Sequence, residues 1–195
     1  MSALHSSSIR LLAAAFLVAF FPLNAAPLSE DHPCAALVRK YLTCVVNQDW
    51  KTAASMLEAE SLERKQKETI SIIKSAPTMS EEAAMLERFA VSDIRDLEKL
   101  TPQQFYIIDR EAWHKRLNAG DEVTKRKQKT LKIDVLGLVE EKEKGFVHAT
   151  VRTSQETLTD RIEELFLISF IKAGDQWTIS PEMKDRPIIT PLKAN

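Results

Sequence analysis

A stretch with apolar residues on both sides of the backbone, residues 161–172, constrains the fold more than any other part of this chain. Successive side chains of a β-strand point to opposite faces of the sheet. Two apolar rows result, with Ile162, Phe166, Ile168 and Phe170 on one face and Leu165, Leu167 and Ile171 on the other. A strand that is apolar on both faces needs a cover on both. We therefore predict the central strand of an antiparallel sheet, placed between a helical layer and a second cover.

Helical signals fill the half of the chain that precedes this stretch. Apolar residues recur with a period of 3.6 in residues 33–47, and Asp49 is placed to cap a second helix. Thr101, followed by proline and then by Gln104, forms a capping-box pattern. It predicts a helix from residue 102 to about Asn118, ended by Gly120.

From about Lys125 the apolar period changes from helical to two. Strands are predicted over residues 129–140, 146–153 and 161–172, and a last one contains Trp177 and Ile179. The glycine at position 137 indicates a bulge in the first of them. The order of elements predicts an α+β fold, with N-terminal helices packed on one face of a four-stranded antiparallel meander sheet.

The second face of that sheet requires a further partner, because helices cover only one. A large exposed apolar patch is unusual in a monomer. Two answers stay open: a homodimer formed through the sheets, or N-terminal helices that fold around the sheet edge.

The first 26 residues have the layout of a cleavable signal peptide. An unbroken apolar run of about 11 residues follows Arg10, and small residues end the segment near Ala25 and Ala26. The run is shorter than the roughly 20 residues of a membrane span. We expect export to the periplasm or beyond, a domain over residues 27–183, a loose tail over 184–195 and no stable membrane anchor after cleavage. An uncleaved N-terminal anchor is the alternative.

Cys34 and Cys44 lie ten residues apart in one predicted helix. Their Cα atoms should therefore be roughly 15 Å apart, which is too far for a disulfide. We expect buried free thiols, and a bridge between two chains is the alternative.

Composition argues against several functional classes. Lys and Arg number 27 against 28 acidic residues, which predicts no general attraction to nucleic acid. With only 4 glycines, a glycine-rich cofactor loop is not expected, and no cofactor is predicted. The histidines lack the spacing of a metal site, so no metal is predicted either.

Several segments resemble the nuclear transport factor 2-like (cystatin-like cone) superfamily. They are the run YLTCVVNQDWKTAA at 41–54, the stretches 89–91 and 100–105, and the strand segments 133–140, 147–152 and 165–177. The resemblance implies a curved sheet that wraps a long helix into a cone with an open pocket. Members include isomerase-like, dehydratase-like and cyclase enzymes as well as non-catalytic binding domains, so fold alone does not assign chemistry. Many members have a strand hairpin between the second and third helices, whereas this chain has a helical pattern there.

Asp109 is the first candidate for chemistry. On its predicted helix it lies between Phe105 and Trp113 on the apolar face, with Tyr106 adjacent and Arg116 two turns further on. A carboxyl in an apolar cavity has a raised pKa and is suited to general acid or base catalysis. The alternative is an acid at the cavity rim, paired with Arg116 or with a cation of the sheet.

His148 is the second candidate. It shares one strand parity with Arg152, and Asp134 lies on the hairpin partner. Resemblance to cone enzymes suggests that His148 could join an acid–base set. The alternative places it on the outer side of the sheet with Phe146.

These observations predict an exported binding or interaction module with an apolar pocket for a small apolar ligand. Its binding residues would be Phe105, Trp113, Arg116 and Arg152. The alternative is a cofactor-independent isomerase, dehydratase or cyclase that uses Asp109, Tyr106 and His148. Convergence of these three on one cavity would favour the enzyme, and an ion-paired Asp109 would favour the module.

Overall fold

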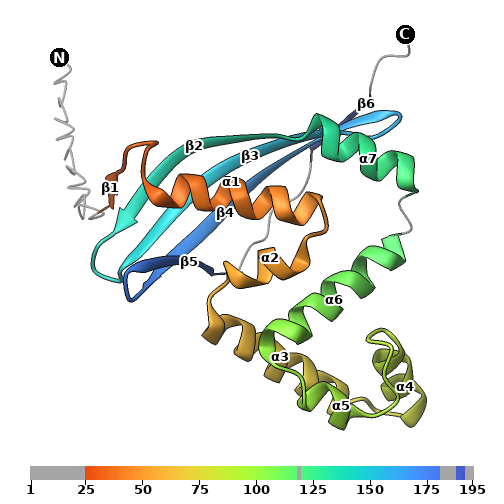
Figure 1. The fold of residues 1–195 in the computed structure, drawn as a ribbon. Helices are drawn as coiled ribbons and strands as arrows, with labels where there is room; N and C mark the ends of the chain where they lie inside the picture. Colours follow the sequence, from red (N-terminus) through yellow and green to blue (C-terminus); the bar gives the residue numbers. More distant parts are fainter. Residues whose placement is uncertain (1–24, 118–119, 181–187, 192–195) are drawn as a thin grey trace, which may run out of the picture.

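The computed structural model of the protein describes residues 25–117, 120–180 and 188–191, and it has an α+β fold (Figure 1). The helices are α1 (Pro33–Val46), α2 (Trp50–Ser55), α3 (Ala59–Lys74), α4 (Met79–Glu87), α5 (Ile94–Glu98), α6 (Pro102–Leu117) and α7 (Asp121–Thr130). The strands are β1 (Ala25–Pro27), β2 (Lys132–Glu141), β3 (Phe146–Glu156), β4 (Asp160–Ala173), β5 (Gln176–Ser180) and β6 (Ile188–Pro191). The predicted fold class is confirmed. Most of the expected signal peptide, residues 1–24, lies outside the described residues.

The predicted helix caps form. The Asp49 carboxylate accepts a hydrogen bond from the Thr52 amide at 3.1 Å and begins α2. At the start of α6 the Thr101 hydroxyl accepts from the Gln104 amide at 3.2 Å, and the Gln104 side chain accepts from the Thr101 amide at 2.8 Å. This reciprocal pair satisfies two amides that have no partner within the helix.

The strands β2 to β5 form the predicted antiparallel meander within an open, curled sheet. The register of β2 slips between Val135 and Gly137, which confirms the bulge. Two short strands were not predicted: β1 pairs with β2, and β6 pairs with the beginning of β4. The tail expected to be loose therefore contributes a strand at Ile188–Pro191.

The inner face of the sheet is the main core. Val147, Val151, Ile168, Phe170 and Ile179 are all fully buried. They pack against residues of α1, α2 and α3, namely Cys34, Ala35, Val38, Tyr41, Leu42, Ala53 and Leu62. A second cluster, formed by Ile73, Leu86, Phe89, Leu97 and Phe105, joins α3 to α6 below the sheet in Figure 1. The space between the sheet and α1 is thus filled by side chains.

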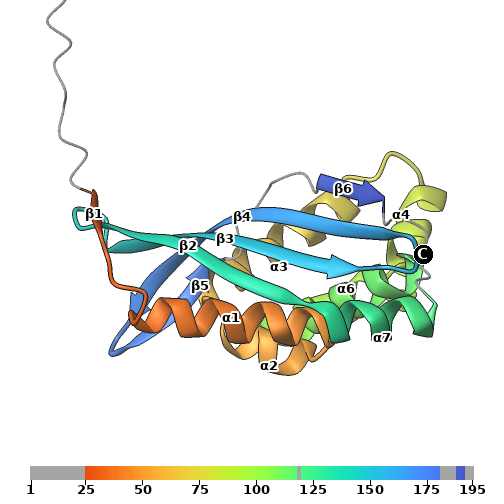
Figure 2. The same cartoon turned by 90° about the horizontal axis from the view of Figure 1, so that it is seen from above.

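None of the described helices covers the outer face of the sheet. Figure 2 shows α1, α2 and α7 together on the other side. Leu165 and Leu167 of β4 are 44% and 54% exposed. The expectation that N-terminal helices fold around the sheet edge is therefore wrong, because the apolar stripe of α1 is buried against the inner face.

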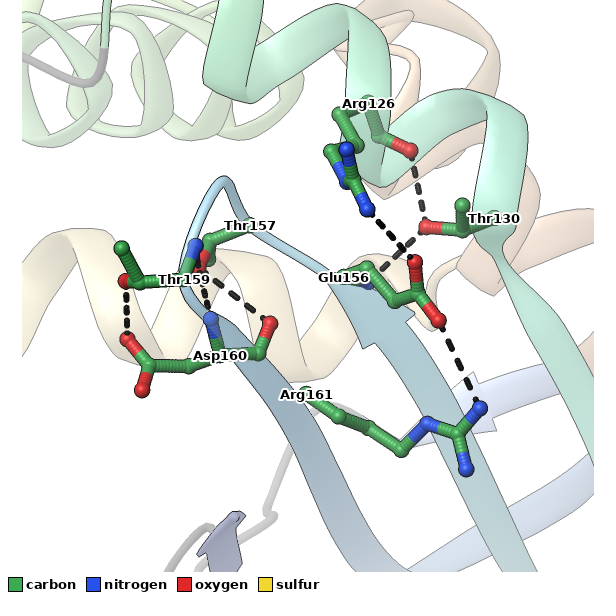
Figure 3. Close-up of polar contacts among 7 residues, drawn as sticks. All are labelled: Arg126, Thr130, Glu156, Thr157, Thr159, Asp160 and Arg161. Atoms are coloured by element: carbon green, nitrogen blue, oxygen red, sulfur yellow. Dashed lines mark hydrogen bonds and ion pairs between the residues drawn. The ribbon is translucent and has the colours of Figure 1, made fainter. Parts of the chain in front are cut away.

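The segment after Lys125 is helical up to Thr130, where a period of two was expected to begin. The end of α7 is attached to the β3–β4 hairpin by polar contacts (Figure 3). The Glu156 amide donates to the Thr130 hydroxyl at 2.8 Å, and the Glu156 carboxylate accepts from Arg126 at 3.1 Å and Arg161 at 3.4 Å. These tertiary contacts hold a helix that has no buried residue of its own.

Cys34 and Cys44 both lie in α1 and form no disulfide with each other, as predicted. Cys34 is fully buried and Cys44 is half-buried. Burial raises the pKa of the Cys34 thiol to about 12.

Iodoacetamide at pH 8 is expected to modify Cys34 only after denaturation. With a pKa of about 12, roughly one thiol in ten thousand is the reactive thiolate at that pH, and reagent access is blocked by the core. Peptide mass spectrometry before and after addition of guanidinium measures this, with half-buried Cys44 as the internal comparison. Equal modification of Cys34 in native and denatured protein would contradict the burial.

Candidate functional site

Asp109 lies in the middle of α6 and is buried, with only 7% of its surface exposed. Both carboxylate oxygens carry an ion pair. Arg88, at the end of α4, donates to Oδ1 at 2.5 Å, and Arg110 donates to Oδ2 at 2.6 Å. Asp109 is therefore ion-paired, as expected under the alternative to a catalytic role. Its partners are Arg88 and Arg110, however, and not Arg116. Its charge is compensated within the fold, and each of its oxygens already accepts a hydrogen bond from a guanidinium.

Arg110 is held by more than its ion pair. Its guanidinium lies 5.8 Å from the centre of the Tyr106 ring and 5.9 Å from that of Trp113. Such stacking adds to charge pairing because the face of an aromatic ring is electronegative. The Arg110 Nε atom is buried with no hydrogen-bond partner among the described residues. Arg110 therefore contacts Asp109, Tyr106 and Trp113, all on α6.

Tyr106 contacts a second phenol. Its hydroxyl lies 3.3 Å from that of Tyr41 on α1. Burial raises the pKa of Tyr106 and that of Tyr41. Both phenols are therefore protonated at neutral pH and serve as hydrogen-bonding groups between α1 and α6.

His148 lies on the outer face of the sheet, on the opposite parity to buried Val147. Its Nδ1 is 2.9 Å from the Ser169 hydroxyl, its Nε2 is 3.2 Å from Glu141, and its ring stacks on Phe146 at 6.0 Å. This environment matches the alternative prediction, in which His148 lies on the outer side of the sheet with Phe146.

Arg152 is exposed on the same outer face, opposite Leu165 in the register. The structure thus separates the candidate residues. Asp109, Tyr106, Trp113 and Arg116 share α6, whereas His148 and Arg152 lie across the sheet from the helices.

Ser169, His148 and Glu141 have the order of a nucleophile, a base and an orienting carboxylate. Glu141 also pairs with Lys144 at 2.8 Å, and hydrogen bonds from Lys144 and then His148 lower its pKa. However, Ser169 lies within β4 where β3 and β5 pair on both sides, so the neighbouring backbone N–H groups serve the ladders. Acyl transfer needs donors aimed at the developing oxyanion, and mid-strand backbone does not supply them. We interpret the three residues as a surface hydrogen-bond chain.

A hollow of about 630 Å³ lies between α4 and α6. Its apolar lining consists of Ala84, Phe89, Ala90, Ile108 and Ala112, and its charged lining consists of Glu87, Arg88, Glu111, Lys115 and Arg116. It is outside the sheet cone that the family resemblance implies. Predicted Arg116 is part of the lining, while Phe105 is buried in the cluster next to it.

Two further charged residues were not anticipated from the sequence. Arg88 pairs with Asp109 from 21 positions away, and no local pattern marks it. Glu164 is a half-buried acid on the inner parity of β4, between Ile162 and Phe166, and burial raises its pKa. Glu164 is a charged residue among side chains that are otherwise apolar on that side of the strand, and this pattern could have identified it from the sequence.

Within the described ranges, no cluster of three or more His, Cys, Asp or Glu residues is arranged to hold a metal ion. None of the described helices has the length and apolar character needed to cross a bilayer. Comparison with known protein families, with curated proteins and with solved structures gives no match to this chain.

Proposed function

We propose that this protein is a non-catalytic binding module whose ligand occupies the hollow between α4 and α6. The observation that carries this proposal is the pairing of both Asp109 oxygens with arginines. A general acid or base must reach its substrate with a free proton or lone pair. Asp109, the acid beside the hollow, is ion-paired with Arg88 and Arg110. This pairing favours a binding function over a catalytic one.

The enzyme alternative has less support from the positions of its residues. Asp109 is neutralised, the phenol of Tyr106 has a raised pKa, and His148 lies on the far side of the sheet. An isomerase, dehydratase or cyclase of the expected type would need them around one cavity.

The lining indicates a small amphipathic ligand with an anionic group. The volume, about 630 Å³, falls in the range of small-molecule sites. Phe89, Ile108 and Ala112 offer apolar contact, and Arg88 is already paired with Asp109, which leaves Lys115 and Arg116 as the lining cations that can meet a ligand. Lys115 and Arg116 form no ion pair with any described residue and are exposed, so they are available to an anion.

Titration with 8-anilinonaphthalene-1-sulfonate, an amphipathic anion whose fluorescence rises on burial, tests this proposal. We expect saturable binding to the wild-type protein and at least about tenfold weaker binding to Ala112→Trp, because the indole fills the hollow. Lys115→Glu/Arg116→Glu should also weaken binding, because the charge of the rim is reversed.

Leu167→Asp, on the outer sheet face, is the control and should leave the affinity unchanged if the probe binds the hollow. Unchanged affinity in a folded Ala112→Trp protein, as judged by circular dichroism, would overturn the proposal.

A further inference from the structure

One stripe of α6 forms a wall of the hollow between α4 and α6. The lining residues of this helix are Ile108, Glu111, Ala112, Lys115 and Arg116. They lie at positions i, i+3, i+4, i+7 and i+8, which share one face of an α-helix. The stripe is apolar at two positions and charged at three, with both signs present. A ligand in the hollow therefore meets apolar and charged side chains of the same helix.

The end of α4 adds a second acid, Glu87, to this lining. The Glu87 carbonyl accepts a hydrogen bond from the Ala90 amide at 2.9 Å, and the Leu86 carbonyl accepts one from the Val91 amide at 3.3 Å. These bonds satisfy carbonyls at the end of α4 that have no partner within the helix. The folded end of α4 therefore sets the position of Glu87 beside the hollow.

Apart from Arg88, the charged residues of the lining have no counter-charge within the described part of the chain. Glu87, Glu111, Lys115 and Arg116 are all exposed, and none of them forms an ion pair with a described residue. Glu111 and Lys115 do not pair with each other, although Glu and Lys four positions apart on a helix are neighbours that can do so. Two negative and two positive side chains are thus left for a ligand.

We propose that the ligand of the hollow is a zwitterion with an apolar body, of the chemical class of an α-amino acid with a long apolar side chain. This inference rests on the proposed binding function and narrows its ligand class. The anionic group pairs with Lys115 and Arg116, and an ammonium group next to it pairs with Glu87 or Glu111. The apolar body contacts Phe89.

The spacing of the charges disfavours an anion that lacks the ammonium group. Glu111 precedes Lys115 by about one helical turn, or about 6 Å along the axis of α6. This separation is smaller than the Debye length of about 8 Å at physiological ionic strength. An anion at Lys115 is therefore also repelled by Glu111, and a cation at Glu111 is repelled by Lys115. A ligand that carries both charges has a counter-charge for each.

Three fluorescent probes that share a dansyl group and an alkyl chain test the proposal. Nε-dansyl-lysine is zwitterionic, its Nα-acetyl derivative is anionic, and dansylcadaverine is cationic. In fluorescence titrations of the wild-type protein, the zwitterion should bind about three- to fivefold more tightly than either of the other two. The size of this preference is that of one solvent-exposed ion pair.

Removing the acids of the lining should abolish the preference without blocking the hollow. Glu87→Gln/Glu111→Gln should weaken binding of the zwitterion about three- to fivefold and leave the anionic probe bound at least as tightly as before. The matched control is Glu122→Gln on α7, which removes an exposed acid outside the lining and should leave all three affinities unchanged. Circular dichroism establishes that each variant is folded.

The outcomes separate this inference from the proposed function. If the anionic probe binds the wild type as tightly as the zwitterion, or if Glu87→Gln/Glu111→Gln keeps the preference, the inference is overturned. The proposed function still stands in that case, provided that Ala112→Trp weakens binding of the probes. If no probe binds the wild type, both are overturned.

Discussion

Replacing Phe170 by alanine is expected to lower the free energy of unfolding by about 3–5 kcal/mol, the range for truncating a buried aromatic ring. Phe170 is fully buried in β4, paired with Val147 on β3 and with Ile179 on β5. Its ring lies in the core that joins the sheet to α1 and α2. Removing it leaves a cavity between elements that cannot all collapse inward. Urea denaturation followed by circular dichroism measures the loss.

Phe146→Ala is the matched control, because it makes the same change in the same sheet on the outer face. Phe146 is only half-buried, so its truncation should cost roughly a third as much. Equal losses for the two variants would mean that the inner face is not the main core. The comparison is made at a protein concentration where both variants have the same oligomeric state.

The periodic features of the fold could be predicted from the sequence because their causes are local. The apolar parities of residues 161–172 predicted a central strand, and β4 spans Asp160–Ala173. The capping box at Thr101 and the bulge near Gly137 each depend on a few neighbouring residues, and both are present.

Features that depend on contacts between distant segments could not be predicted in this way. The helix α7 continues to Thr130 because Glu156 of the sheet bonds its last turn. The partner of Asp109 was expected to be Arg116 on the same helix or a cation of the sheet, but Arg88 reaches it from α4. Helical spacing predicts which side chains share a face, and it does not predict which neighbouring helix will supply a counter-charge.

Asp109→Ala is expected to destabilise the protein by about 2 kcal/mol. Breaking a fully buried ion pair costs roughly 3–5 kcal/mol because a charge is left without its partner. The side chains of Arg88 and Arg110 are 36% and 33% exposed, so water can partly solvate them after the change and the cost is reduced. The melting temperature and the urea midpoint report the effect.

The control for this prediction is Asp96→Ala, which removes a solvent-exposed ion pair with Lys99. That change should shift stability by no more than about 0.5 kcal/mol. A double-mutant cycle with Arg88→Met should give a coupling of about 1 kcal/mol or more between Arg88 and Asp109. If Asp109→Ala destabilised the protein as little as Asp96→Ala does, this would contradict the structural role of the ion pair between Asp109 and Arg88.

The same variant links stability to the proposed ligand site. Arg88 and Asp109 connect the end of α4 to the middle of α6, and these two helices form the walls of the hollow. Asp109 does not itself line the hollow, but Asp109→Ala frees the lining residue Arg88 from its ion pair. If the hollow is the binding site, the loosened α4 and the freed Arg88 should change the affinity for 8-anilinonaphthalene-1-sulfonate in the folded variant. Destabilisation with full probe affinity would instead mean that Leu86 and Phe89, through the second apolar cluster, are sufficient to position α4.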